Sequence, residues 1–203
     1  MNIPECLTIL PRDRRGYPIP VTVAVDRAGN AHFAVTDPVA RKRMIEEDRC
    51  HISGRKLLRG RWFVGGPMAA FHEFGAFLDG PTLAEASLFA VRTCPFLAAP
   101  KYSRRIDDLT LRKSGAPGIA AAVLHEEVVS DRPEVFVRLM CVGQRLVPSS
   151  HGDVLFVPKR PYRNVEFWRH GKMLAFDEGV DLAVEVSKGQ LTRDAVLAAC
   201  GKK

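Results

Sequence analysis

The sequence predicts an α+β fold, because its strand and helix patterns follow one another without the regular β-α-β alternation of a parallel sheet. A hairpin pattern opens the chain, and the second half reads as a small, mostly antiparallel sheet with C-terminal helices. Of 203 residues, 46% are hydrophobic and 26% are charged, which is ordinary for a globular protein. We expect a single domain over 1–203, with a sub-division into 1–99 and 119–203 around a basic loop at 100–118 as an open alternative.

The first predicted elements are a hairpin and a helix. Two β-rich runs, 21–25 and 32–35, flank a turn with Gly29 and Asn30 and so predict a β-hairpin. Asp37 can accept hydrogen bonds from the free N–H groups of a first helical turn, and Pro38 has no N–H to lose, so a helix should run from there to about residue 48. Its buried stripe is expected to contain Val39, Met44 and Ile45, with Arg41, Lys42 and Arg43 mostly outside it.

The next predicted elements are a tight turn, a strand and a second helix. Residues 50–54 form the turn, and residues 56–64 form a strand or hairpin that ends at a Gly-Gly-Pro sequence. Thr82 and Glu85 have the spacing of a capping box, in which each side chain satisfies a backbone N–H at a helix start. A helix is therefore predicted from Thr82 to about residue 93.

The second half is predicted to form a small sheet that two helices close. Asp177 and Thr192 can each act as an N-cap, so these helices should run to about residues 188 and 200. The strands are expected from β-rich runs at 135–142, 154–157, 165–168 and 173–176, the last two joined by a turn at Gly171-Lys172.

A basic surface is the main functional signal in the sequence. Lys and Arg number 30 against 23 Asp and Glu, which leaves a net charge of +7. Such a balance favours a polyanionic partner, either nucleic acid or an acidic protein surface, and a basic protein without such a partner is the alternative. The candidate partner-binding residues are Arg55, Lys56, Arg59 and Arg61, then Lys101, Arg104 and Arg105, then Lys159, Arg160 and Arg163.

Aromatic residues stand beside several of these clusters, at Trp62, Tyr102, Tyr162 and Trp168. Cations that bind phosphates, together with rings that stack on bases, are typical of proteins that bind single strands or RNA. The competing interpretation is that the cations form solvated faces while the rings turn into the core. We favour this second interpretation for Trp62 and for Trp168 when each is considered alone.

The cysteines and the N-terminus indicate a reducing compartment. The 5 cysteines are odd in number, far apart in the sequence and without a C-x-x-C pair, which argues against a disulfide scaffold. The N-terminus has neither the charged and apolar regions nor the cleavage site of a signal peptide. No apolar run approaches the ~18 residues of a membrane span. A cytoplasmic location without membrane contact is therefore expected.

Three stretches occur in an order that resembles a known pattern: RCHISGRKLLRGRWFVGGPM at 49–68, PTLAEASLFAVRTCPFL at 81–97 and VEFWRHGKMLAFDEGVDLAVEVSKG at 165–189. They are similar to an uncharacterised family of small bacterial and phage-borne proteins. That family shows a C-x-x-C-G turn, an FV-GPM strand end and a P-x-H-x-x-C helix start that leads to C-P-F-L. A tryptophan-rich strand and a basic hairpin then precede a helix. The resemblance covers most of the chain and implies no particular activity.

The family's two Cys and its His/Cys pair imply a treble-clef zinc site, since Zn²⁺ takes four N or S ligands in a tetrahedron. Carried over position by position, Cys50 is the first ligand, Ser53 replaces the second Cys, and Leu83 and Ala86 replace the helix His and Cys. The resemblance therefore implies a degenerate treble clef that binds no metal, with apolar packing in place of the zinc. A less favoured ligand set that restores the site is His51 and His72 with Cys50 and Cys94.

The sequence shows no complete catalytic constellation. His125 and the two glutamates after it lack the second His of a zinc-protease motif, and the sequence neighbours Ser149 to Asp153 do not define a triad, which forms in space. The Gly-Gly-Pro at 65–67 lacks the Lys and Ser or Thr of a phosphate loop. An enzyme with an unrecognised site around His51, His72 or His125 is the last of three hypotheses.

The leading hypothesis is a non-enzymatic basic binding protein that uses no cofactor and contacts nucleic acid or a nucleic-acid-handling complex. The second is a protein-interaction module, such as a phage-borne inhibitor of a host complex, whose basic face meets an acidic protein surface. Affinity for nucleic acid that falls steeply with salt distinguishes the first, because bound Lys and Arg displace counterions.

Overall fold

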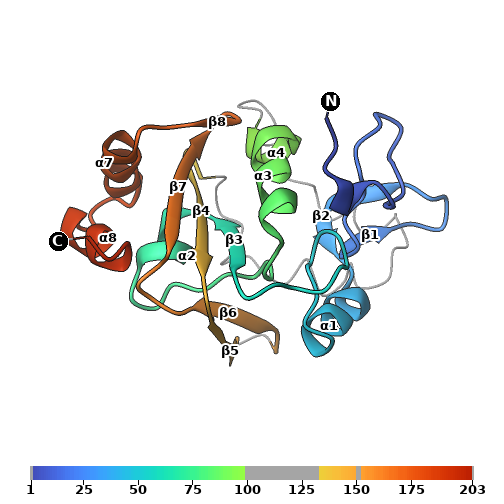
Figure 1. The fold of residues 1–203 in the computed structure, drawn as a ribbon, viewed down its shortest axis with the longest axis horizontal. Helices are drawn as coiled ribbons and strands as arrows, with labels where there is room; N and C mark the ends of the chain where they lie inside the picture. The colour runs from blue at the N-terminus through green and yellow to red at the C-terminus, as the bar shows by residue number, and fades with distance from the viewer. Residues whose placement is uncertain (1, 99–132, 150–151, 203) are drawn as a thin grey trace. The chain divides into compact units, whose positions relative to one another are not determined.

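The chain has an α+β fold in which short helices pack on small antiparallel sheets, as the sequence predicts (Figure 1). The computed structural model describes residues 2–98, 133–149 and 152–202. These residues divide into two compact units: unit 1 comprises 2–56, and unit 2 comprises 57–98, 133–149 and 152–202. In this part of the chain, no helix combines the length and the apolar character needed to cross a bilayer.

Unit 1 contains the predicted hairpin, which is confirmed. β1 (Val23–Val25) and β2 (Ala31–Thr36) pair antiparallel. Asp26 closes the turn between them, because its Oδ1 accepts hydrogen bonds from the backbone N–H of Ala28 and of Asn30, both at 2.9 Å. The bonds from Asn30 are the main cause that lowers the pKa of Asp26 to about 2. A short 3₁₀ helix, η1 (Glu5–Leu7), lies earlier in the same unit.

The helix α1 (Pro38–Glu46) begins at the predicted cap. Asp37 Oδ1 accepts hydrogen bonds from the backbone N–H of Val39 and of the next residue, at 2.8 and 3.1 Å. The predicted buried stripe is partly wrong, because Val39 is 73% exposed whereas Arg41 is buried together with Met44. At about 100° per residue, Val39 lies about 140° around the helix from Met44, but Arg41 lies only about 60° from it.

Unit 2 is built on a four-stranded antiparallel sheet of order β3-β4-β7-β8. Its central strand β4 is almost entirely buried, because α3 and α4 lie on one side of the sheet and α2, α7 and α8 on the other (Figure 1). A two-stranded sheet, β5–β6, continues from the end of β4. The elements are β3 (Arg61–Gly65), α2 (Pro67–Phe71), α3 (Ala84–Thr93), α4 (Pro95–Ala98), β4 (Phe136–Cys141), β5 (Gln144–Pro148), β6 (Val154–Pro158), β7 (Asn164–Arg169), β8 (Lys172–Met173), α7 (Phe176–Val186) and α8 (Arg193–Ala199).

Phenylalanine rings form much of the core of unit 2. The rings of Phe71 in α2 and Phe167 in β7 lie 5.9 Å apart, which joins the helix to the sheet. Gly179 brings α7 against the same ring, since a Cβ at this position would lie 2.2 Å from the Cγ of Phe167. The rings of Phe63 and Phe156, 6.1 Å apart, attach the β5–β6 hairpin to β3. The core therefore fixes the hairpin that carries the site described below.

The predicted capping box at Thr82 is wrong, because a tertiary contact takes its side chain. The Thr82 hydroxyl donates to the carbonyl of Trp62 at 3.0 Å, and the two residues form a β-bridge. Leu83 is consequently the residue that precedes α3, and it forms no side-chain cap.

The two C-terminal helices begin differently. Thr192 caps α8 as predicted, since its Oγ1 accepts a hydrogen bond from the N–H of Ala195 at 3.2 Å. Asp177 is not the cap of α7, which is Ala175; it lies in the first helical turn, and its carboxylate pairs with Arg193 at 2.6 Å. Both helices exist where the sequence places them, and only the cap of α7 differs.

The return strand predicted at 173–176 forms, with Met173 opposite Trp168, but it is shorter than predicted. The chain reverses at His170 and Gly171, whose φ angles are 51° and 74°, and β8 is only two residues long. Phe176 already belongs to α7, because its ring packs edge-on against Phe167 at 5.7 Å. The strand β5 and the short helix α2 are further elements that the sequence patterns did not predict.

Candidate functional site

A concave pocket of about 260 Å³ in unit 2 gathers basic side chains. It lies where the β5–β6 hairpin approaches the loop that follows α2. Arg145, Lys159 and Arg160 line it, and Glu73 is the carboxylate among its lining residues. The remaining lining residues are Gly75, Val157, Pro158 and Tyr162. Two of the three cations, Lys159 and Arg160, belong to the clusters that the sequence predicts.

The β5–β6 hairpin positions Arg145 and Lys159. Arg145 is directly opposite Val157 in the antiparallel register, so their side chains lie on the same face of the hairpin. The N–H of Lys159 donates to the carbonyl of Gly143 at 2.8 Å. A Cβ on Gly143 would lie 3.2 Å from Lys159 Cδ, so the glycine leaves room for the lysine stem. Both cationic side chains are exposed, and neither forms an ion pair with any described residue.

Arg160 is held against the C-terminal end of α2. Its Nη2 donates to the carbonyls of Ala70 at 3.0 Å and His72 at 2.7 Å. The last carbonyls of a helix have no partner within the helix, so a cation satisfies them well. The Tyr162 hydroxyl donates a hydrogen bond to the carbonyl of Ala70 at 2.6 Å and accepts one from Arg160 Nε at 3.3 Å. Burial raises the pKa of Tyr162, which keeps the phenol protonated and donating. Arg160 thus forms a fixed cationic wall of the pocket.

The loop after α2 folds back tightly on the helix. A Cβ at Gly75 would lie 2.5 Å from the Met68 carbonyl oxygen and 2.7 Å from that of Ala69, so only glycine fits there. Phe74, between the pocket residues Glu73 and Gly75, is 81% exposed. The sequence reasoning did not single out Phe74, because nothing in its neighbourhood distinguishes it from the other phenylalanines nearby.

The other predicted basic residues are distributed over both units. Arg55 and Lys56 lie in unit 1, where Arg55 Nη2 donates to the carbonyl of Glu5 at 3.2 Å and Lys56 Nζ to that of Glu47 at 2.9 Å. In unit 2, β3 and β7 both begin at the end of the sheet where β4 ends and the β5–β6 hairpin is attached. Arg59, Arg61 and Arg163 lie at this end, whereas Lys101, Arg104 and Arg105 fall outside the described residues.

Three of the four aromatic residues named beside the basic clusters lie within the described residues, and these three pack against the protein. Trp168 is 3% exposed and Tyr162 is 5% exposed. The half-buried Trp62 ring is covered by the guanidinium of Arg138, whose Cζ lies 3.6 Å from the ring centroid. These rings therefore stabilise the fold, which is the interpretation that the sequence favours for the two tryptophans. Tyr102 lies outside the described residues.

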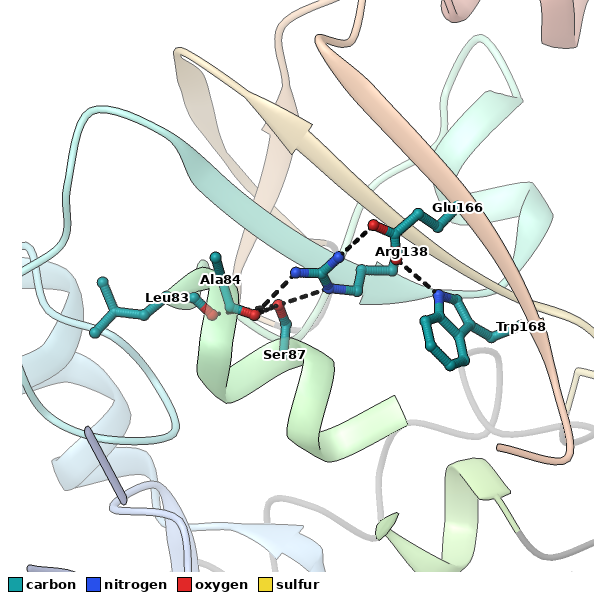
Figure 2. Close-up of polar contacts among 6 residues, drawn as sticks. All are labelled: Leu83, Ala84, Ser87, Arg138, Glu166 and Trp168. Atoms are coloured by element: carbon teal, nitrogen blue, oxygen red, sulfur yellow. Dashed lines mark hydrogen bonds and ion pairs between the residues drawn. The ribbon is translucent and has the colours of Figure 1, made fainter. Parts of the chain in front are cut away.

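A second polar constellation joins β4 to α3 (Figure 2). Arg138, whose side chain is 4% exposed, donates to Glu166 Oε1 at 2.6 Å, to the Ala84 carbonyl at 2.8 Å and to Ser87 Oγ at 3.0 Å. The other Glu166 oxygen accepts from Trp168 Nε1 at 3.0 Å. Burial lowers the pKa of Arg138, and the ion pair with Glu166 opposes that shift. All three guanidinium nitrogens are engaged inside the protein, so this constellation holds α3 on the sheet.

The residues that correspond to the zinc ligands of the resembled family fall in both units. Cys50 and Ser53 lie in unit 1, where the N–H of Ser53 donates to Cys50 Sγ at 3.3 Å. Leu83 and Ala86 lie at the start of α3 in unit 2, and Ala86 is fully buried. Over 2–98, 133–149 and 152–202, no three His, Cys, Asp or Glu side chains are grouped so that they could hold a metal ion.

The histidines considered for an enzyme site have structural surroundings. His51 is 5% exposed, and its pKa is lowered to about 4, first by burial and then by the charge of Arg41. His72 Nδ1 accepts a hydrogen bond from the N–H of Phe74 at 3.3 Å. His125 lies outside the described residues. The two described histidines thus support loops in their respective units.

No family model, curated protein or solved structure matches this chain at a significant level. The resemblance to a phage-borne family and the degenerate zinc site therefore stay predictions. The functional conclusion rests on the chemistry of the pocket.

Proposed function

We propose that this is a non-enzymatic binding protein that holds the phosphate backbone of a nucleic acid at the basic pocket of unit 2. The observation that carries the proposal is the convergence of Arg145, Lys159 and Arg160 on one concavity. Arg and Lys side chains are the usual partners of phosphate oxygens in nucleic-acid complexes. Three cations and one carboxylate, Glu73, leave a net charge of +2 (3 − 1) on the lining.

The size and accessibility of the pocket suit a phosphate and its sugar. Its volume of about 260 Å³ is just below the ~300–1,000 Å³ typical of sites for whole small-molecule ligands. Arg145 and Lys159 are exposed, so a continuous backbone can reach them without entering a closed cavity. Arg59, Arg61 and Arg163 at the same end of the sheet provide further positive charge for neighbouring phosphates.

A salt titration of binding tests the proposal. The full-length protein is titrated with labelled single-stranded DNA, duplex DNA and RNA between about 50 and 200 mM salt, an interval over which several phosphate contacts together lose a large, measurable part of the affinity. The same titration is run on the double variant Arg145→Ala/Lys159→Ala. The slope of log K against log salt is negative, and each lost phosphate contact makes it about 0.7 less steep for a single strand. The slope of the double variant should therefore be about 1.4 less steep than that of the wild-type protein.

The double variant Lys42→Ala/Arg43→Ala is the matched control. Both variants remove two positive charges from a net +7, but Lys42 and Arg43 are exposed residues of α1 in unit 1. The control should keep the wild-type slope. Equal losses in both variants would show that net charge alone drives binding, and no binding to any of the three nucleic acids at low salt would overturn the proposal.

A further inference from the structure

We infer that the ligand at the basic pocket is a single-stranded nucleic acid, with one unpaired base stacked on the exposed ring of Phe74. The inference rests on the proposed function, because the pocket must first hold the backbone. It adds the strandedness of the ligand and an aromatic contact that the charged residues do not supply.

The position of Phe74 is the first part of the argument. Its two sequence neighbours, Glu73 and Gly75, both line the pocket, so the backbone of Phe74 lies at the edge of the site where the phosphates are proposed to lie. The side chain is 81% exposed, the most exposed phenylalanine among the described residues. A large ring that gains almost nothing from burial contributes little to folding, whereas a base beside a bound phosphate would cover its free face.

The rigidity of this loop is the second part. The N–H of Phe74 donates to His72 Nδ1 at 3.3 Å, and the N–H of Gly75 donates to the His72 carbonyl at 2.9 Å. That same carbonyl accepts from Arg160 Nη2 at 2.7 Å. The imidazole and the Phe74 ring are 5.7 Å apart, so one side of the aromatic ring already has a neighbour. The backbone under Phe74 and the cationic wall of the pocket are therefore fixed to each other by shared hydrogen bonds.

The chemistry of stacking selects a single strand. Every base has a π face, so an aromatic platform next to a positively charged groove binds single strands without strong sequence preference. In a duplex the bases are already stacked on one another and are not available to an external ring. The charged residues alone would hold either form, so Phe74 is the feature that separates them.

The test compares Phe74→Ala and Phe74→Trp with the wild-type protein, by anisotropy of a labelled single strand and of the duplex of the same sequence. Phe74→Ala should weaken single-strand binding about 5- to 140-fold, the range that corresponds to loss of one stacked base, and leave duplex binding and the salt slope unchanged. Phe74→Trp should retain single-strand affinity, and its added tryptophan emission should be quenched on binding. Met173→Ala, 62% exposed in β8 at the other end of β7, is the matched control and should bind like wild type.

The outcomes separate the inference from the proposed function. If the wild-type protein binds with a steep salt slope but Phe74→Ala changes neither form, the stacking contact is wrong while the phosphate pocket stands. If Phe74→Ala weakens single strand and duplex equally, the selectivity for single strands is wrong. If the wild-type protein binds no nucleic acid, the proposed function itself fails.

Discussion

Removal of the Glu166 carboxylate should destabilise unit 2 by about 3 kcal/mol, at the low end of the range for breaking a buried ion pair. In Glu166→Ala, Arg138 keeps its charge in a position where its side chain is 4% exposed and loses the partner at 2.6 Å. The bonds to Ala84 and Ser87 remain, but both acceptors are uncharged. The cost arises because the buried guanidinium keeps its desolvation penalty and loses the carboxylate charge that offset it.

Urea unfolding followed by tryptophan fluorescence measures this loss directly. The chain has 2 tryptophans, and both lie at the Arg138 constellation: Trp62 under the guanidinium and Trp168 bonded to Glu166. Asp181→Asn, which breaks an exposed pair with Arg193, is the matched control and should cost at most about 1 kcal/mol. Adding Arg138→Met to Glu166→Ala should recover part of the stability, because no buried charge then remains. A loss below about 1 kcal/mol in Glu166→Ala would refute the reasoning.

Three further predictions concern other parts of the chain. Gly179→Ala should destabilise unit 2 by about 1–3 kcal/mol, despite the better helix propensity of alanine, because the new Cβ would meet Phe167 Cγ at 2.2 Å; a gain in stability by urea unfolding would contradict the packing of α7. The pKa of about 4 for the buried His51 lies below its unfolded value of 6.5, so the neutral imidazole is favoured in the folded state. Its contribution to the free energy of unfolding is therefore fully present above pH ~6.5 and is lost as the pH falls towards ~4. Wild type should lose about 3 kcal/mol across that window relative to His51→Gln, measured by circular dichroism at each pH, and parallel pH profiles would disprove burial of a neutral His51. Glu73→Gln should tighten nucleic-acid binding by about fivefold, the effect of removing ~1 kcal/mol of repulsion, and weaker binding would show that this carboxylate does not face the phosphates.

The parts of the fold that depend on local chemistry were predictable from the sequence. Asp37 caps α1, Thr192 caps α8, and the turn after β1 forms, because each needs only hydrogen bonds between residues a few positions apart. Thr82 shows the limit of such reasoning. It has the right spacing for a capping box, but the carbonyl of Trp62, 20 residues away, takes its hydroxyl. No local pattern contains that contact.

The site was predictable only in part, for the same reason. Lys159 and Arg160 stand out as adjacent charges, whereas Arg145 is a single arginine in a strand that the sequence patterns did not predict. It reaches the pocket through the register of β5 with β6, which depends on the whole hairpin. Phe71, Phe74 and Phe77 cannot be told apart by residue type or by their neighbours in the sequence. Only the three-dimensional packing shows that Phe74 is exposed whereas the other two rings belong to the core. Arg138 reads as one more basic residue, and its role follows only from its burial between β4 and α3.

The central claim is that the basic pocket of unit 2 is where the nucleic acid binds. The most direct measurement is a map of amide chemical-shift changes in the full-length protein as a short single-stranded oligonucleotide is added at low salt. The account predicts that the largest changes occur at residues 73–75, 143–145 and 157–162, and that they reverse as salt is raised. Changes concentrated in unit 1, for example around Arg55 and Lys56, or in the basic segment 100–118, would contradict it.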